Sequence, residues 1–325
     1  MELKRLSFKH KNSKILYYVK NRLNTLIPTS FFQKKLNFEL KKIENFNQED
    51  VSEILNRVAY YNKLETSKLL NEDLTKIKDF KIKGHKKVYF YDFYEYLKFF
   101  NPLFKVKYLF GDITKIPNEP SFVKSRPING DNENSVVLKW NKIRHFITIK
   151  NEKNSFREKQ DKLVFRGRLR ESLPNRVDFV AKYINHPLCD VGDMNKKAMK
   201  PEWKVDRMTI DEQLEYKFIL SLEGNDVATN LKWIMSSNSV VVMPKPKFET
   251  WYMEGTLIPG HHYILIEDDY SDLESKLNYY IENPDKAEAI IKNANKYAAN
   301  FRNKEKEDLI SLMVINKYFE KTNQL

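Results

Sequence analysis

The sequence predicts an α/β fold, and one stretch in the second half of the chain carries the prediction. Residues 218–222 form an apolar run with the length of a buried strand, and it ends at the polar turn 223–226. Apolar residues then recur at helical spacing, at positions 227, 231, 234 and 235, before a second buried run at 239–243. Strand, turn, helix and strand in this order predict a right-handed parallel crossover.

Ligands of parallel sheets bind beyond the carboxyl ends of the strands, where a helix N-terminus presents free N–H groups. In this stretch that place is the turn of Glu223, Gly224 and Asn225. A scaffold crossover without a ligand gives the same pattern, so the turn by itself leaves both interpretations open.

Length and charge limit the classes of protein. A chain of 325 residues suits two domains, and a hydrophobic content of 41% with 21 Phe and 18 Tyr supplies material for packed cores. The net charge of +13 indicates an anionic partner. Nucleic acid, membrane phospholipid and sugar nucleotide all satisfy that requirement.

The residue types exclude several kinds of site. Cys189 is the single cysteine, which excludes an internal disulfide and a thiolate metal site. The six histidines lack metal-ligand spacing, and no Asp lies two positions from another Asp, so the sequence predicts no metal-bound diphosphate of the DxD kind. No apolar run approaches the roughly 20 residues of a membrane span. We expect a soluble, cytoplasmic protein.

The first 35 residues are basic and amphipathic. They contain nine lysines and arginines against the single acid Glu2, interleaved with apolar residues. A helix of this kind can lie on an anionic membrane surface. Alternatively, it is a solvated first helix that packs on its own domain.

The first half of the chain also contains a candidate catalytic acid. Residues 88–91 and 106–110 read as strands, and Asp112 follows the second of them. A carboxylate at the carboxyl end of a strand occupies the usual position of catalytic groups in α/β folds. Capping of the turn at Thr114 is the alternative role.

A second group of candidate residues lies at positions 124–126. Lys124 and Arg126 flank the hydroxyl of Ser125 just before a proline, which predicts an anion contact; a solvated loop is the alternative. Further strands are expected at 136–138 and 146–149. The polar segment 150–162 then marks the domain boundary, which gives domains 1–152 and 153–325.

The second domain opens on a strand at 163–165 that leads into the basic turn of Arg166, Gly167 and Arg168, and a helix begins at Asn175 and Arg176. Guanidinium groups bind phosphate bidentately, and glycine lets the backbone approach, so these residues predict a diphosphate clamp. Surface arginines near a turn are the alternative. Further on, Trp251 and Tyr252 lie in a long aromatic loop, where they either pack on a sugar ring or belong to the core.

These motifs, taken in order, resemble glycosyltransferase family 90. The resemblance rests on Asp112, on KSRP at 124–127, on FRG at 165–167, on Arg176, on EGND at 223–226, on SSNSVVVMP at 236–244 and on Trp251 before LIPGHHY. It covers roughly residues 105–300. One departure concerns the helix after the glycine turn, where family members commonly carry an arginine and this chain has Asn230, with Lys232 nearby.

The resemblance implies a GT-B architecture, in which two Rossmann-like domains face each other across a cleft. The N-terminal domain would hold the acceptor, and the C-terminal domain would hold a UDP-sugar. The family transfers the sugar with inversion and without an obligatory metal. Asp112 would be the base, and the donor would be bound by Lys124, Ser125, Arg126, Arg166, Gly167, Arg176, Glu223, Gly224, Asn225, Asn230 and Lys232.

The implied function is transfer of glucose, galactose or xylose from a UDP-sugar to a hydroxyl of a bacterial lipopolysaccharide or another surface glycan. The acceptor would be a glycan or a lipid-linked glycan, and the enzyme would be cytoplasmic, peripheral at the inner membrane. The alternative is a basic nucleic-acid-binding protein without catalysis. Because the cations beyond residue 35 are scattered among acids, no nucleic acid partner is expected. A membrane-surface scaffold with an inactive transferase fold is a third interpretation.

Overall fold

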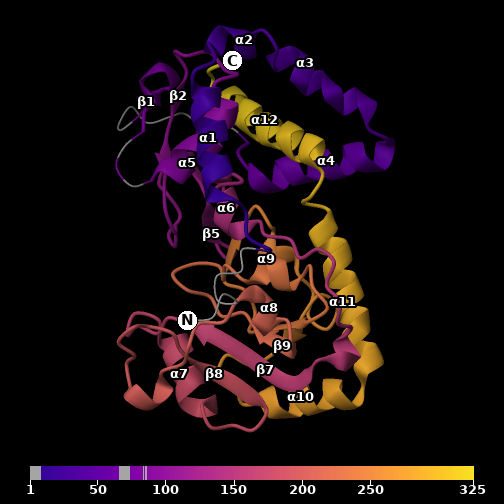
Figure 1. The fold of residues 1–325 in the computed structure, drawn as a ribbon. Helices are drawn as coiled ribbons and strands as arrows, with labels where there is room; N and C mark the ends of the chain where they lie inside the picture. Colours follow the sequence, from indigo (N-terminus) through magenta and orange to yellow (C-terminus); the bar gives the residue numbers. More distant parts are fainter. Residues whose placement is uncertain (1–8, 66–73, 83, 85) are drawn as a thin grey trace. The chain divides into compact units, whose positions relative to one another are not determined.

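The computed structural model describes residues 9–65, 74–82, 84 and 86–325 (Figure 1). The chain forms two compact units, each assembled from separate segments. Unit 1 contains the described residues up to 12, with 144–246 and 256–300; unit 2 contains the described part of 13–143, with 247–255 and 301–325. The division near residue 143 lies close to the expected boundary at 152, but the chain returns to unit 2 twice more.

Unit 1 is built on a five-stranded parallel sheet. Its strands are β7 (Gln160–Gly167), β8 (Cys189–Asp193), β9 (Tyr216–Leu220), β10 (Val240–Met243) and β12 (Ile264–Leu265). They lie in the order β12-β10-β9-β7-β8, and every neighbouring pair is parallel. Figure 1 shows β7 and β9 side by side. The strand order reverses direction between β7 and β9.

The predicted strands at 218–222 and 239–243 are confirmed as β9 and β10, and they pair in parallel. All residues of both strands are buried, which explains their continuous apolar runs. The helix between them, α9 (Leu231–Ile234), is shorter than the pattern predicted. The side chain of Asn230, the N-cap residue of α9, donates to the carbonyl of Leu220 at 2.9 Å. A side-chain hydrogen bond of this kind competes with the helical conformation, so α9 starts only after Asn230.

Three helices complete unit 1 around the sheet: α7 (Pro174–Tyr183), α10 (Leu273–Glu282) and α11 (Pro284–Ala299). Phe179 of α7 packs against Phe165 of β7 and Tyr270, with ring centroids 6.1 and 5.0 Å apart. These rings belong to one buried core that spans the strands and the inner helix faces. A short helix, α8 (Ile210–Gln213), begins after the N-cap residue Thr209, whose side chain accepts from the amide of Glu212.

Unit 2 combines helices with short sheets. Its helices are α1 (Lys14–Thr25), α2 (Thr29–Gln33), α3 (Leu36–Lys41), α4 (Gln48–Tyr61), α5 (Lys87–Leu97) and α12 (Lys304–Lys321), and α6 (Lys142–His145) lies where the chain leaves the unit. Strands β3 (Tyr108–Leu109), β4 (Ser121–Val123) and β6 (Ser135–Val137) are parallel. Antiparallel pairs are formed by β1 (Thr75–Lys76) with β2 (Lys105–Val106), and by β5 (Ser125–Pro127) with β11 (Phe248–Thr250).

Two predicted strands are wrong. Residues 88–91 belong to helix α5, whose buried residues Phe90, Phe93 and Leu97 recur at helical spacing. Aromatic residues are enriched in strands. Over the four residues 88–91 this preference predicted a strand, because so short a segment does not reveal the helical spacing of the apolar residues. Residues 146–149 form no strand.

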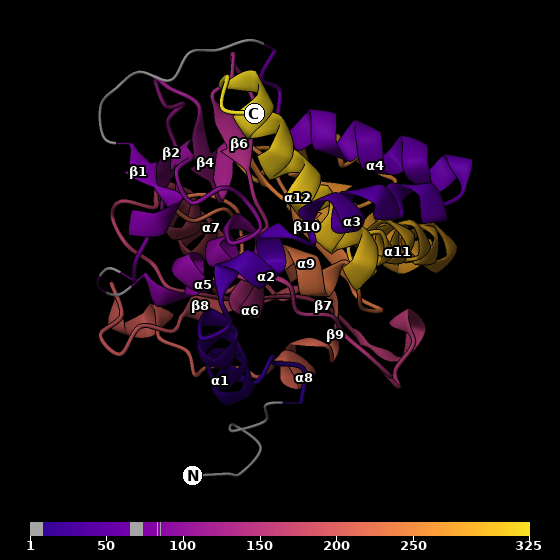
Figure 2. The ribbon, with the colours of Figure 1, turned by 90° about the horizontal axis from the view of Figure 1, so that it is seen from above.

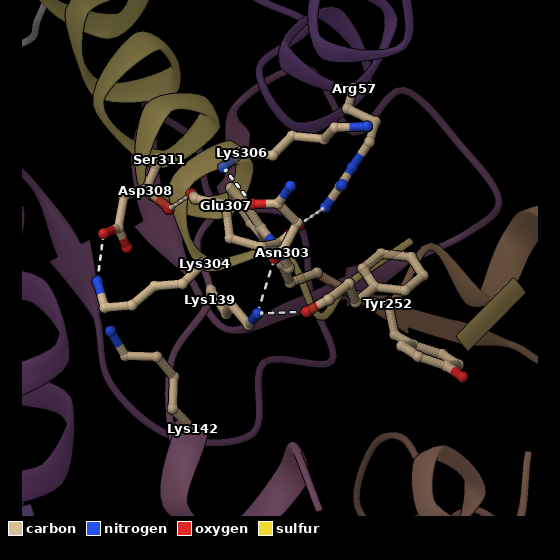
Figure 3. A network of polar contacts seen from close by, with 12 residues as sticks. Arg57, Lys139, Lys142, Tyr252, Asn303, Lys304, Lys306, Glu307, Asp308 and Ser311 are labelled. Atoms are coloured by element: carbon tan, nitrogen blue, oxygen red, sulfur yellow. Dashed lines mark hydrogen bonds and ion pairs between the residues drawn. The ribbon is translucent and has the colours of Figure 1, made fainter. Parts of the chain in front are cut away.

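The C-terminal helix explains why unit 2 is discontinuous. Figures 1 and 2 show α12 beside α4. On α12, the buried carboxylate of Glu307 lies 2.6 Å from the guanidinium of Arg57 and 2.7 Å from the ammonium of Lys139 (Figure 3). Trp251 donates its indole N–H to the same carboxylate at 2.6 Å. Three distant segments therefore share one buried polar centre, which a single boundary after residue 152 would divide.

Trp251 belongs to the core of unit 2. Its side chain is fully buried, and its ring stacks on that of Tyr61 at 3.9 Å between centroids. Of the two roles left open by the sequence, the structure gives Trp251 the core role.

No helix in the described part of the chain combines the length and the apolar character needed to cross a membrane.

Candidate functional site

The carboxyl ends of β7 and β9 form the switch point of the unit 1 sheet, since the strands on either side were added in opposite directions. Ligands of parallel sheets bind at such a point. Strand β7 ends in Arg166 and Gly167, and the turn with Glu223 and Gly224 follows β9. The fold therefore brings the FRG and EGND motifs to neighbouring strands.

Arg176 binds the turn that carries the EGND motif. It lies in the first turn of α7, where Pro174 is compatible with the helix start. Its Nε donates to the carbonyl of Glu223 at 3.1 Å, and its Nη2 donates to that of Leu222 at 2.8 Å. Asn175 donates its side-chain amide to the same Glu223 carbonyl at 3.0 Å. The turn after β9 is thus fixed by the start of α7, while Nη1 of Arg176 takes part in neither bond.

A second arginine lies close to Arg176. Burial lowers the pKa of Arg176, and the neighbouring charge of Arg170 lowers it further. Arg170 is exposed. Its charge acts unfavourably on that of Arg176, and a bound anion would relieve this repulsion. Arg170 was not among the residues expected from the sequence, where its one signal is a position between FRG and Arg176.

Close contacts explain why two positions at this site are glycine. A Cβ on Gly224 would lie 3.1 Å from Nη2 of Arg176, so the turn approaches the guanidinium as closely as a glycine allows. A Cβ on Gly167 would lie 2.3 Å from the ring of Phe165, which is buried in the core. A larger residue at Gly167 would therefore displace a core aromatic ring.

Arg166 does not join this group. Its Nη2 lies 2.6 Å from Oδ1 of Asp190 on β8, and its Nη1 donates to the carbonyl of Asp190 at 2.7 Å. Tyr216 donates its hydroxyl to the other oxygen of the same carboxylate at 2.5 Å. The side chain of Arg166 is only 9% exposed. The structure thus corrects the expectation of a direct clamp, because the guanidinium is engaged with the neighbouring strand.

The remaining expected residues of unit 1 are spread around the turn. Asn225 is exposed at its tip, and Asn230 is held by the carbonyl of Leu220. Lys232 is buried, with its ammonium 5.8 Å from the ring of Phe146. Asn230, where this chain departs from the family pattern, therefore hydrogen-bonds to the last residue of β9. Its neighbour Lys232 lies inside the unit.

In unit 2, Asp112 and Lys124 form an ion pair. Lys124 Nζ lies 2.5 Å from Oδ1 of Asp112, and the lysine is buried while the carboxylate is partly exposed. Ser125 accepts from the amide of Ile113 at 3.1 Å, so β5 holds the loop on which Asp112 lies. Gly111, just before it, has φ of +124°, a conformation that favours glycine. Lys124 and Ser125 thus position the acid.

Arg126 is buried inside unit 2, where it has a structural role. Its side chain is fully buried, and Nε lies 2.7 Å from Oε1 of Glu249 on β11. Its other nitrogens donate to the carbonyls of Ser135 at 3.1 Å and Tyr60 at 2.7 Å. The expectation that Arg126 contacts a ligand is therefore corrected, because its donors are occupied within unit 2 and the guanidinium is closed to solvent.

A cavity of about 370 Å³ lies beside the Asp112 loop. It is lined by Lys81, Lys86, Phe90, Tyr108, Leu109, Phe110 and Ile113. Aromatic side chains and two ammonium groups suit a sugar ring or an anionic substituent. Among the described residues, no group of three His, Cys, Asp or Glu is arranged to hold a metal ion.

The profile described as Glycosyl transferase family 90 matches residues 131–319, more than half of the chain. The chain belongs to glycosyl transferase family 90. This confirms the resemblance drawn from the motifs, and it decides for glycosyl transfer over nucleic-acid binding without catalysis. The matched segment contains Arg166, Arg176 and the turn after β9. Asp112 precedes the matched segment, so the assignment of Asp112 as the base depends on the geometry of the site.

Individual relatives agree with the family 90 assignment. O-glucosyltransferase LpsA of Dichelobacter nodosus is 41% identical over 306 residues, which cover 94% of this chain and 95% of that protein. Protein O-glucosyltransferase 3 of Homo sapiens is 27% identical over 173 residues, covering 51% of this chain and 33% of that protein. The family 90 chain is therefore a glycosyltransferase that uses a sugar donor and a glycan acceptor.

Proposed function

We propose that the chain transfers a sugar from a UDP-sugar to a hydroxyl of a bacterial lipopolysaccharide or related surface glycan, with inversion at the anomeric carbon. The observation that carries the proposal is the junction of Arg176 with the turn after β9, at the switch point of the sheet. Glucose is the first choice of sugar, because the relative of 41% identity is called an O-glucosyltransferase. Galactose and xylose are the alternatives.

The donor diphosphate would bind between Arg170 and Arg176, against the backbone of Gly224. As the bond between the sugar and UDP breaks, negative charge accumulates on the diphosphate. Fixed guanidinium charges stabilise that charge more in the transition state than in the ground state. They supply the positive charge for which other transferases use a metal ion, so we propose transfer without an obligatory metal.

The acceptor hydroxyl would lose its proton to the carboxylate of Asp112. Its oxygen would attack the anomeric carbon from the face opposite UDP, which inverts the configuration as the UDP bond breaks. Lys124 and Ser125 would hold Asp112 in place, and the adjacent cavity would take part of the acceptor. We infer a GT-B transferase that works at the cytoplasmic side of the inner membrane.

Other expected residues would act indirectly. Arg166 would shape the end of β7 through Asp190, and Arg126 would fix β5 through Glu249. Asn230 would hold the end of β9 next to the turn, Lys232 would act from inside the unit, and Glu223 and Asn225 would contact the donor from the turn itself. Gly167 would leave room beside the Phe165 ring.

The first test is a thermal-shift screen with UDP, UDP-glucose, UDP-galactose, UDP-xylose, UDP-GlcNAc, and GDP- and CMP-sugars. We expect stabilisation by the UDP compounds alone, with a difference among the sugars that identifies the donor. Stabilisation by the GDP- or CMP-sugars instead would refute the UDP assignment. Transfer is then measured with and without EDTA, and loss of turnover in EDTA would overturn the metal-independent mechanism.

A further inference from the structure

Helix α1 presents its apolar side chains to solvent. Ile15 is 76% exposed, Leu16 70%, Val19 52% and Leu23 60%, and Leu26 at the C-cap is 73% exposed. At 100° per residue, these positions fall within one sector of the helix and form a continuous stripe, here called the α1 stripe. Five large aliphatic side chains in water on one helix face are more than the isolated exposed residues of an ordinary surface.

The opposite face of α1 is polar and faces the protein. The hydroxyl of Tyr17 donates to Oδ1 of Asp92 on α5 at 2.7 Å, and Asn24 accepts from the ammonium of Lys98 at 2.7 Å. Asn21 on the same face is buried. A surface helix of a globular protein normally has the reverse arrangement, with its apolar stripe toward the core. Polar contacts, together with edge-to-face packing of Tyr17 and Tyr18 on Tyr91, therefore hold α1 in an orientation that leaves its stripe outward.

The charges around the stripe have one sign. Residues 13–38 contain five cations and no acid; the cations are Lys14, Lys20, Arg22, Lys34 and Lys35. By helical spacing, Lys20 and Arg22 flank the α1 stripe on its two sides. An apolar face bordered by cations is typical of helices that lie in the interface of an anionic bilayer.

Exposed apolar residues continue beyond α1. Ile27 before α2, Phe31 on α2 and Phe38 on α3 are each at least two-fifths exposed. The ammonium of Lys35 lies 4.1 Å from the centroid of the Phe31 ring. Residues 1–8 of the expected basic segment lie outside the described residues, so the inference rests on α1 to α3.

We propose that the α1 stripe binds the surface of an anionic lipid bilayer, with α1 lying in the plane of the interface. A nucleic acid would engage the cations but would leave the aliphatic side chains in water. A second copy of the chain would bring the same positive charges together. A bilayer with anionic headgroups satisfies both features, since its acyl region accepts the stripe and its headgroups accept Lys20 and Arg22.

The test is flotation of the full chain with vesicles of phosphatidylcholine alone or mixed with phosphatidylglycerol. We expect binding to the mixed vesicles that weakens as salt is raised. The triple variant Leu16→Ser, Val19→Ser, Leu23→Ser should bind at least about tenfold more weakly, because burial of aliphatic surface drives insertion. Lys20→Gln with Arg22→Gln should weaken binding by roughly fivefold per charge and reduce the salt dependence.

The matched control is Leu55→Ser with Leu103→Ser, which removes exposed leucines elsewhere in unit 2 and should bind like the parent chain. Thermal unfolding verifies that each variant folds. Equal binding by the triple variant and the parent overturns the proposal. So does a dimer that the triple variant converts to a monomer, or binding to RNA at physiological salt that depends on Lys20 and Arg22 alone.

The membrane proposal is independent of the proposed reaction. Stabilisation by UDP compounds should be the same in the triple variant and in the parent chain. Failure of flotation with normal UDP binding would therefore overturn only the membrane surface, and the reverse result would overturn only the donor assignment.

Discussion

Lys124 holds Asp112 by an ion pair of 2.5 Å between Nζ and Oδ1, and the two residues come from segments 12 positions apart. The lysine is buried, while the carboxylate keeps part of its surface in solvent. Both the catalytic role and the capping role at Thr114 are compatible with this ion pair, and mutation of Asp112 separates them.

Asp112→Asn should abolish transfer and leave donor binding intact. The amide cannot accept the acceptor proton, so kcat should fall by about 10² to 10⁴. Stabilisation by UDP should be unchanged. The matched control is Asp79→Asn, which alters an exposed aspartate of the same unit. Near-normal turnover by Asp112→Asn would remove Asp112 from the mechanism.

Arg176→Met should weaken the donor site in two ways, because it removes a charge and releases the turn after β9. We expect kcat/KM to fall by about 10² to 10³. Arg170→Met removes only the exposed charge, so a loss of roughly tenfold with unchanged stability is expected. Arg157→Met, on the surface of the same unit, is the control. If Arg170→Met has full activity, the paired cations are not the diphosphate site.

Arg166 and Asp190 should behave as one unit. If Arg166 acts through its ion pair, Asp190→Asn will reproduce most of the effect of Arg166→Met on activity. In urea unfolding, the double variant should be less destabilised than the sum of the singles, with a coupling of about 1 kcal/mol. Arg168→Met alters an exposed neighbour and should have little effect. Additive losses, with activity sensitive to Arg166→Met alone, would return Arg166 to direct donor contact.

Glu307→Gln should destabilise unit 2 in a pH-dependent way. Burial alone would raise the pKa of Glu307, but the charges of Lys139 and Arg57 outweigh it, so the pKa lies below its ordinary value. The ionised carboxylate therefore stabilises the folded state above the ordinary pKa, and this contribution is lost as pH falls through the lowered value. Removing it takes a charged partner away from the buried cations Arg57 and Lys139, at a cost of about 3 kcal/mol at pH 7.

The measurement is urea unfolding of the parent chain and Glu307→Gln at steps from pH 7 to pH 3. The difference in the free energy of unfolding should be constant at neutral pH and should shrink below about pH 4. Glu305→Gln, an exposed residue of the same helix, serves as the control. A difference that grows on acidification would contradict the assigned direction of the pKa.

Local pattern predicted the centre of unit 1 well. The buried runs that became β9 and β10, and the turn between β9 and α9, were read directly from the sequence because a parallel strand is apolar on both faces. The same reasoning failed at residues 88–91. Four residues rich in Tyr and Phe fit both a strand and a buried helix, and only the packing of Phe90 and Phe93 inside unit 2 separates the two.

The site was predicted as a set of residue types but not as a set of contacts. Arg166, Arg176 and Gly224 were named together, yet the structure pairs Arg166 with Asp190 and leaves Arg176 with the turn. Arg126 was expected at a ligand and is buried against Glu249. A guanidinium near a turn looks the same in sequence whether its partner is a phosphate or a carboxylate on the next strand.

The sequence by itself determined the α/β fold class, the family, and the basic amphipathic start of the chain, since periodicity, motif order and charge are local properties. Tertiary structure alone decided that Lys124 supports Asp112, that α12 joins unit 2 through Glu307, and that the α1 stripe faces outward. Helical periodicity defines a face but not what covers it. The cover depends on contacts between residues far apart in the chain, here Tyr17 with Asp92.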